Sequence, residues 1–269
     1  MAEQKTLVKV EKDGGVAVFT LDDPPANTYT HEMMKQIDAA TIDARFDPEV
    51  SVIVIRGAGE KFFCAGANID MLQKSDPTWK YYFCLHANET LSRLEHTPKL
   101  VIAALNGHTV GGGLEVAMAA DIRIARQGAG KIGMPEVALG VLPGTGGTQR
   151  FARLVGKARA IEMMAAGELF SFEAARDIGL VNHVWGDADL GGRTFAQAVY
   201  EYARQFTPPH KAARAVGHIK RAVQSGLESG FSEGLALERE LQQRLFESDD
   251  AKEGLKANLE KRPPTFTGR

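Results

Sequence analysis

Short apolar segments rich in β-branched residues alternate with long helical patterns through the first half of this 269-residue chain. Segments such as VIVIRG favour strands, because β-branched side chains pack well on a pleated surface. We expect strands at residues 16–21, 50–57, 99–107 and 120–125, with helices between them at residues 31–46 and 78–97. Strands that alternate with helices favour an α/β fold with at least partly parallel pairing.

The C-terminal part of the chain has a different pattern. Three helical patterns follow one another there with no strand between them, at residues 210–223, 231–246 and 250–261. We therefore divide the chain into a core, residues 1–205, and a C-terminal helical region, residues 206–269. Such a region either caps the core or docks against another subunit.

Charge and cysteine content disfavour several classes of protein. The 32 basic and 34 acidic residues give a formal net charge of -2, whereas a nucleic-acid-binding surface needs a clustered excess of Lys and Arg. The two cysteines, Cys64 and Cys84, predict no disulfide framework and favour a reducing compartment. The first residues lack the apolar core of a secretion signal, and no apolar run approaches the roughly 20 residues that span a bilayer. We expect a cytoplasmic protein with no membrane span and no nucleic-acid partner.

Two of the expected strands lead into glycine-bearing loops, at residues 58–72 and 108–118. Ligands of α/β sheets bind outside the carboxyl ends of strands, so both loops can face one site. The glycines at residues 111–113 either permit close packing of a helix on a strand or leave backbone bare for a reacting group. A nucleotide loop is the weaker alternative. The chain has no G-x-x-x-x-G-K-[ST] motif, neither loop holds a full G-x-G-x-x-G, and GTGGTQ at residues 144–149 does not follow a strand.

Two glutamates give these loops a chemical interpretation. If the helix after the glycines begins near Gly112, Glu115 lies one turn inside it, on the face of the first free N–H groups. A carboxylate beside a free donor suits proton transfer next to a polarised carbonyl better than it suits an anionic phosphate. Glu136 follows Pro135 in a mostly uncharged stretch that favours burial, and a buried carboxylate must be paired or carry a raised pKa. Alone, Glu136 has the features of a surface or capping residue; together with Glu115 it becomes a candidate catalyst.

The segments FCAGANIDM, IAALNGHTVGGGLEVAMAADIRIA and GMPEVALGVLPGTGGTQRFARLVG closely resemble the crotonase superfamily, and most of all its enoyl-CoA hydratases. The resemblance covers most of the chain in the expected order. It implies an α/β fold, a spiral of ββα repeats followed by a C-terminal helical region that supports trimers, commonly paired into hexamers. It also implies reversible syn addition of water to a trans-2-enoyl-CoA, giving a 3-hydroxyacyl-CoA. No metal or redox cofactor is implied, since coenzyme A is part of the substrate.

The resemblance assigns site roles residue by residue. The backbone N–H groups of Ala67 and Gly112 match the oxyanion hole, where a Cβ at Gly112 is expected to obstruct the thioester. Glu115 matches the base and Glu136 the acid, although two close carboxylates titrate as a pair and this division is left open. Gly144 matches backbone that helps to hold the water. The residues expected along coenzyme A are Ala65, Ala67, Asn68, Ile69, Asp70 and Gly112.

Some positions depart from the family's pattern. Asp22 and Asp23 stand where many relatives carry Asn-Arg, and Asp70 stands where a lysine is common. These departures put the expected contacts to the coenzyme A diphosphate in doubt. The candidate replacements are Lys61, Lys261 and Arg262, across a subunit boundary if necessary. The acyl pocket is expected along a helix at residues 71–86, with Trp79, Tyr81, Tyr82 and Phe83, together with parts of the C-terminal helical region.

Other functions stay open at this stage. Related isomerases and decarboxylases generally lack one of the two glutamates, so the presence of both favours hydration. The alternatives are an enoyl-CoA isomerase, a hydratase of a specialised branched, cyclic or dicarboxylic enoyl-CoA, and a non-catalytic acyl-CoA-binding or RNA-binding homologue. Cys64 has no histidine near it in sequence, which disfavours a nucleophile, and His108 has the features of a solvated or hydrogen-bonded loop histidine. No H-E-x-x-H spacing predicts a metal site.

Overall fold

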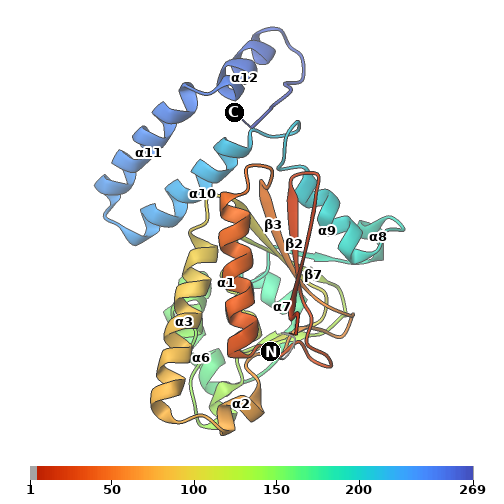
Figure 1. Ribbon diagram of the computed structural model, residues 1–269, viewed down its shortest axis with the longest axis vertical. Coiled ribbons are helices and arrows are strands. Elements are labelled where there is room, and N and C mark those ends of the chain that lie inside the picture. The colour runs from red at the N-terminus through yellow and green to blue at the C-terminus, as the bar shows by residue number, and fades with distance from the viewer. Residues whose placement is uncertain (1–4, 269) are drawn as a thin grey trace.

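A six-stranded, mostly parallel sheet forms the centre of the protein. The computed structural model describes residues 5–268 (Figure 1). The sheet has the order β1-β2-β3-β5-β7-β10, formed by β1 Val8–Asp13, β2 Val16–Leu21, β3 Val52–Gly57, β5 Leu100–Leu105, β7 Ile122–Arg126 and β10 His183–Trp185. The hairpin between the antiparallel β1 and β2 turns at Gly14 and Gly15, whose φ angles of 52° and 83° suit a two-residue hairpin loop. The four strands expected from the sequence are confirmed, with small differences at their ends.

A second sheet collects the short strands that follow the long ones. It has the order β4-β6-β8-β9, formed by β4 Phe62–Cys64, β6 His108–Val110, β8 Lys131–Gly133 and β9 Phe170–Ser171. After each of β3, β5 and β7 the chain enters this second sheet within a few residues and then forms a helix. The repetition confirms the expected spiral of ββα turns. Because β4 and β6 pair in parallel, the loops that follow them emerge side by side.

Helices cover both faces of the long sheet. The helices of the core are α1 His31–Phe46, α2 Ile69–Gln73, α3 Pro77–Glu95, α4 Gly112–Met118, the 3-10 helix η1 Glu136–Leu139, α5 Gly147–Val155, α6 Lys157–Ala166, α7 Phe172–Asp177, α8 Asp187–Leu190 and α9 Phe195–Arg204. Side chains along β3 alternate between two cores, as the pleat of a strand requires. Ile53 and Ile55 face the core that holds α1 and α3, whereas Val52 and Val54 face the core against α9. Within the described part of the chain, no helix has the length and apolarity to cross a membrane.

The helix expected at residues 71–86 is wrong, because the segment is divided between α2 and α3. Asp76 caps α3, and its Oδ1 accepts a hydrogen bond from the N–H of Trp79 at 2.9 Å. Pro77 occupies the first turn, where its missing N–H leaves no bond unmade. The Asp-Pro pair therefore ends one helix and starts the next, which creates a corner at residues 74–76.

Three further helices form the C-terminal region: α10 Ala213–Glu228, α11 Phe231–Phe246 and α12 Asp249–Leu259. Lys220 anchors α10 to the core, with its Nζ 2.9 Å from a carboxylate oxygen of Asp121. α11 and α12 project away from the sheet (Figure 1), and Leu227, Phe231 and Leu259 are exposed. The helical pattern expected for this region is confirmed, while its boundary with the core stays a prediction.

Candidate active site

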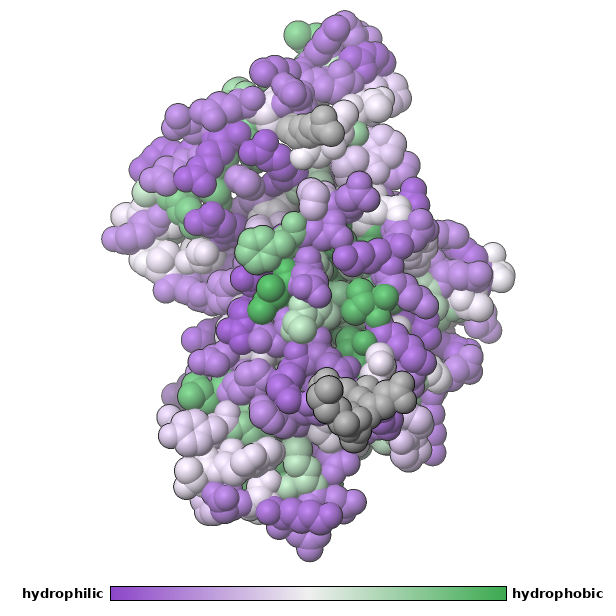
Figure 2. Space-filling view, viewed as in Figure 1, coloured by the Kyte–Doolittle hydropathy of each residue, from purple (hydrophilic) through white to green (hydrophobic). Residues whose placement is uncertain are grey.

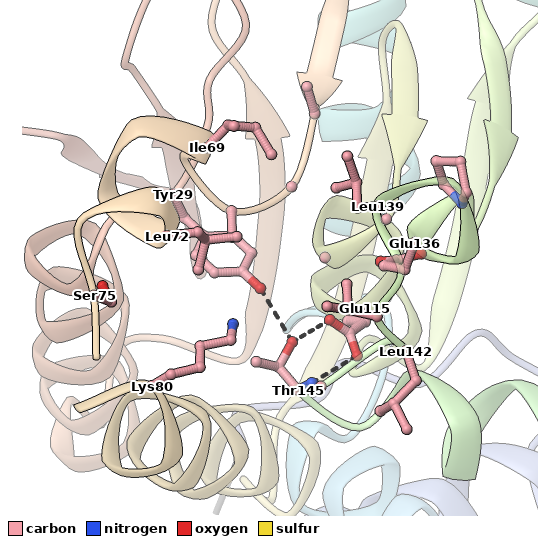
Figure 3. A pocket seen from close by; sticks show the side chains of 18 of the residues that line it. Tyr29, Ile69, Leu72, Ser75, Lys80, Glu115, Glu136, Leu139, Leu142 and Thr145 are labelled. Carbon is pink, nitrogen blue, oxygen red and sulfur yellow. Dashed lines mark hydrogen bonds between the residues drawn. The ribbon is translucent and has the colours of Figure 1, made fainter. Parts of the chain in front are cut away.

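A pocket of about 330 Å³ opens where the loops after β4 and β6 meet. Its other walls come from α2, the first turn of α3, η1 and the loop before α5. Figure 3 shows how side chains from these elements surround the cavity. The volume lies at the lower end of the roughly 300–1,000 Å³ typical of small-molecule sites. The pocket sits at the carboxyl ends of parallel strands, the edge where the sequence predicts it.

Two backbone N–H groups border the pocket without an acceptor. The segment around Gly66 passes beside the first turn of α4, since a Cβ added to Gly66 would lie 3.0 Å from the nitrogen of Gly112. Tyr29 bridges to Ala67 by accepting from the N–H of Asn68 at 3.0 Å and donating to the carbonyl of Gly66 at 2.9 Å. This pairing uses the groups on either side of the Ala67 N–H. In the described chain, neither that N–H nor the N–H of Gly112 donates to a protein acceptor.

At each of the three glycines at residues 111–113, a different neighbouring group leaves no room for a side chain. Gly111 has a φ of 56°, and a Cβ there would lie 2.8 Å from Oε1 of Glu136. A Cβ at Gly112 would lie 2.2 Å from the hydroxyl oxygen of Tyr29. A Cβ at Gly113 would lie 2.0 Å from the carbonyl oxygen of Cys64. The glycines therefore allow close packing and also leave the backbone bare. At Gly112 we expected a Cβ to obstruct the thioester, whereas in the structure it would collide with the side chain of Tyr29.

The carboxylate of Glu115 is buried and held by three donors. The side chain is 2% exposed, and Oε1 accepts from the N–H of Thr145 at 2.8 Å and of Gly147 at 2.7 Å. The hydroxyl of Thr145 donates to Oε2, and its oxygen lies 3.1 Å from the hydroxyl of Tyr29. Figure 3 shows this chain of contacts along one wall. Donors to an ionised carboxylate stabilise its charged form, so this arrangement suits a base.

Glu136 lies in the opposite kind of environment. It opens η1 and is half-buried, and its buried Oε2 has no hydrogen-bond partner. Burial is the main cause that raises the pKa of the Glu136 carboxyl to about 7, and the negative charge of Glu115 contributes to the same rise. Both carboxyl groups line the same pocket (Figure 3). One environment favours the carboxylate and the other the carboxylic acid, the division expected of a base and an acid.

The structure brings most of the expected binding residues to the pocket. Ala65, Ala67, Ile69, Gly112 and Gly144 line it. Asn68 and Asp70 do not line it and belong to α2 instead. The side chain of Asn68 caps this helix by accepting from the N–H of Met71 at 2.9 Å, and Asp70 is exposed in its first turn.

The aromatic residues expected around the acyl group have two different placements. Trp79 and Phe83 stack with their ring centroids 5.3 Å apart, and Phe83 is buried in the core. Tyr81 and Tyr82 are 65% and 61% exposed and lie outside the pocket. None of the four expected aromatic residues lines the pocket, so this expectation is wrong. The two tyrosines occupy the outer face of α3, and Phe83 packs in the core instead.

Among the lining residues that the sequence analysis missed, three carry polar groups that matter for the site. Thr145 holds Glu115, Tyr29 contacts the hydroxyl of Thr145, and Lys80 enters the pocket from the first turns of α3. The sequence did contain a signal for Thr145. It lies in the PGTGG turn before α5, next to Gly144, whose backbone was already expected to help hold the water. Tyr29 and Lys80 had none, because only the folded chain brings them to the glycine loops.

Cys64 and His108 have the structural roles that we expected. Burial raises the pKa of the Cys64 thiol to about 12, and its Sγ accepts the N–H of Gly66 at 3.4 Å. Nδ1 of His108 lies 3.1 Å from the N–H of Lys131 in β8. Across residues 5–268, no group of three His, Cys, Asp or Glu side chains is placed to hold a metal ion.

Acidic residues already neutralise part of the basic charge considered for phosphate binding. Arg262 lies 2.6 Å from a carboxylate oxygen of Glu253 and 2.7 Å from one of Glu260. Lys61 forms no ion pair within the described residues, and its Nζ lies 5.6 Å from the ring centroid of Phe62. Lys61 is therefore the freer of these two cations.

Replacing Thr145 with Val is expected to lower the free energy of unfolding by about 1–3 kcal/mol. Valine keeps the shape and the backbone N–H, but it leaves Oε2 of Glu115 and the hydroxyl of Tyr29 without their shared partner. Urea unfolding measures the change. Thr148→Val on α5 is the matched control, for which we expect a change within roughly 0.5 kcal/mol. Equal unfolding midpoints for both variants would show that the hydroxyl of Thr145 does not support Glu115.

Comparisons with known proteins agree with the fold and identify the family. Residues 11–269 match the family model described as enoyl-CoA hydratase/isomerase. The chain is 37% identical to the short-chain-enoyl-CoA hydratase of Clostridium acetobutylicum over 256 residues, covering 95% of each protein. It is 34% identical to the crotonyl-CoA hydratase of Syntrophomonas wolfei, covering 97% of each. A crystal structure of an enoyl-CoA hydratase from Geobacillus kaustophilus superposes with a TM-score of 0.94 at 45% identity, covering 99% of this chain and 98% of that one.

Proposed function

This chain belongs to the enoyl-CoA hydratase/isomerase family and is an enoyl-CoA hydratase, and we propose that the pocket between β4, β6 and η1 is its active site. One observation carries the proposal. Two carboxyl groups with opposite environments share a pocket with two unpaired backbone N–H groups. Hydration of a trans-2-enoyl-CoA needs these groups, since charge builds on the thioester oxygen while water adds across the double bond.

The N–H groups of Ala67 and Gly112 form the proposed oxyanion hole. When water adds to C3, the electrons of the double bond move through C2 toward the thioester oxygen. Two donors fixed in the backbone stabilise the resulting enolate without reorganising, and losing one such donor typically costs about 2.7–4 kcal/mol. The N–H of Gly112 also opens α4, whose N-terminal end is positive.

Glu115 and Glu136 carry the protons in this mechanism. Glu115 takes a proton from water as the water oxygen bonds to C3, and Glu136 gives a proton to C2 as the enolate collapses. The net change is one water added, and the pair of carboxyl groups keeps one proton throughout. The hydrogen bonds to Glu115 and the raised pKa of Glu136 support this division. The backbone of Gly144 is proposed to help hold the reacting water beside Glu115.

The coenzyme A arm is proposed to run along Ala65, Ala67 and Ile69, which line the pocket together with the groups of the proposed oxyanion hole. Asn68 and Asp70 position this segment through α2 rather than by direct contact. Lys61 is the proposed cation for the coenzyme A phosphates. The proposed reaction uses protons and hydrogen bonds alone and therefore calls for no further cofactor.

Assembly and compartment are part of the proposal. Exposed apolar residues on α10 and α11, among them Leu227 and Phe231, support self-association as a trimer or hexamer through residues 206–269. Cys64 and Cys84 are free thiols, which supports a reducing compartment such as the cytoplasm.

Hydration is tested directly with crotonyl-CoA. The conjugated enoyl-thioester absorbance should fall when the protein is added, and 3-hydroxybutyryl-CoA should accumulate. An isomerase would instead convert a 3-enoyl-CoA to the 2-enoyl isomer without net uptake of water. Turnover of the 3-enoyl thioester with none of crotonyl-CoA would overturn the proposed site chemistry.

The pH dependence of kcat/KM should show when Glu115 and Glu136 lose the one proton that they share. Because the pKa of Glu136 is raised to about 7, kcat/KM for hydration should fall about tenfold per pH unit above pH 7, where the pair loses that proton. For dehydration of 3-hydroxybutyryl-CoA, kcat/KM should fall over the same pH range. The form of the enzyme that is active in dehydration also carries one proton on the pair, but on Glu115 rather than on Glu136. Initial rates in both directions from pH 5 to pH 10 measure this. Profiles that stay flat to pH 9 would contradict the assigned acid.

A further inference from the structure

A lysine enters the pocket on the side where the acyl group must lie. Lys80 stands one turn into α3 and lines the same cavity as Glu115 and Glu136. Figure 3 shows its side chain rising from α3 with the ammonium group pointing into the cavity that Tyr29 and Thr145 also line. Much of the remaining wall is apolar, including Leu72 and Leu142. Lys80 is the one lysine or arginine among the described residues that line this pocket, so its charge distinguishes that part of the wall.

The charge of Lys80 is not neutralised by the protein. Within residues 5–268 its ammonium forms no ion pair and no hydrogen bond, and it lies 5.0 Å from the ring centroid of Phe83. The acidic groups that share the pocket are engaged otherwise. Glu115 is held by three donors, and Asp76 caps α3 through the N–H of Trp79. Burial favours the uncharged acid of Glu136.

The position of Lys80 also separates it from the coenzyme A phosphates. The thioester oxygen is fixed at Ala67 and Gly112, and the pantetheine arm lies between that point and the diphosphate. Ile69, on the proposed coenzyme A path, lies across Leu72 and Tyr29 from Lys80 in Figure 3. A cation on the Thr145 side faces the acyl part of the ligand, where an unsubstituted alkyl chain would leave it without a counter-ion.

We propose that Lys80 binds a carboxylate at the far end of the acyl group, so that the preferred substrates are ω-carboxylated trans-2-enoyl-CoA thioesters. This inference rests on the proposed function, because it assigns a substrate class to the same site. A carboxylate in a partly desolvated pocket gains a charge-assisted hydrogen bond from Lys80. A neutral chain of equal length gains nothing from the ammonium and excludes water from it. The expected selectivity is about 10- to 100-fold in kcat/KM, the usual range for a hydrogen bond to a charged group.

The test compares thioesters that differ only in the terminal group. The pairs are 2-pentenedioyl-CoA with 2-pentenoyl-CoA, 2-hexenedioyl-CoA with 2-hexenoyl-CoA, and 2-octenedioyl-CoA with 2-octenoyl-CoA. For at least one pair, the wild type should prefer the dicarboxylic member. Lys80→Gln should lower kcat/KM for that member at least tenfold, mainly through KM, and should leave its neutral partner within about twofold. Lys80→Arg keeps the charge and should retain most of the preference.

Lys74→Gln is the matched control, since Lys74 is exposed in the corner before α3 and does not line the pocket. It should not change the selectivity. The proposal is wrong if the wild type prefers the neutral member of every pair, or if Lys80→Gln lowers both members equally. Lys80 would then be a solvated lysine packed on Phe83. Failure of the proposed function would look different, because the wild type would hydrate neither crotonyl-CoA nor any member of these pairs.

Discussion

Glutamine at either Glu115 or Glu136 is expected to lower kcat for hydration of crotonyl-CoA by about 10²- to 10⁴-fold, the usual contribution of a positioned acid or base. Glutamine keeps the size of the side chain but neither accepts nor releases a proton in this reaction. Binding should persist, since the N–H groups of Ala67 and Gly112 are backbone groups. Stopped-flow absorbance gives the rate, and calorimetry with a non-hydratable acyl-CoA gives the affinity.

The two variants should differ in their effect on folding. Glu115→Gln places an NH₂ group among the donors Thr145 and Gly147, which now reach the two carboxylate oxygens at short distances. That variant should also lose stability. Glu136→Gln removes a half-buried acid whose Oε2 has no partner, so it should fold as well as the wild type. Glu162→Gln, exposed on α6, is the control for both. Near-wild-type turnover in both active-site variants would show that the mechanism is wrong.

The sequence predicts the local parts of this site well. Apolar β-branched runs identify β2, β3 and β5, and the glycines at residues 111–113 locate the start of α4 and thus the place of Glu115 within it. The loops after β4 and β6 could be placed together because parallel strands end at one edge of a sheet. The two glutamates could be paired as candidate catalysts from the sequence, and the resemblance then assigned a role to each. These inferences use periodicity, glycine conformation and motifs, which are all written along the chain.

The remaining parts depend on contacts between distant segments. Tyr29 lies far along the chain from Thr145, yet their hydroxyl oxygens are 3.1 Å apart. No local pattern in the sequence indicates that a tyrosine before α1 supports a carboxylate on α4. Lys80 similarly depends on the corner at Asp76 and Pro77, which turns the start of α3 toward the pocket. One uninterrupted helix over residues 71–86 would have given a different lining, and this explains why the wrong aromatic residues were expected there.

Gly112→Ala is expected to lower kcat by at least 10²- to 10³-fold, the usual cost of losing one oxyanion-hole donor. The added Cβ would lie 2.2 Å from the hydroxyl oxygen of Tyr29 and 2.7 Å from its Cε1, so either α4 or Tyr29 must move. Movement of α4 displaces the N–H of Gly112. Movement of the Tyr29 side chain breaks its contact with the hydroxyl of Thr145, which holds Glu115. Both responses disturb the proposed catalytic groups.

The control for this substitution is Gly226→Ala in α10, where a Cβ meets nothing within 4 Å. That variant should keep full activity and gain slightly in stability, since alanine favours a helix by about 1 kcal/mol over glycine. Circular dichroism and urea unfolding of both variants separate a folding defect from a catalytic one. Tyr29→Phe alone removes the hydroxyl while keeping the ring, so it tests the link to Thr145 without moving α4. If folded Gly112→Ala turns over crotonyl-CoA within about threefold of the wild type, the N–H of Gly112 does not stabilise the enolate.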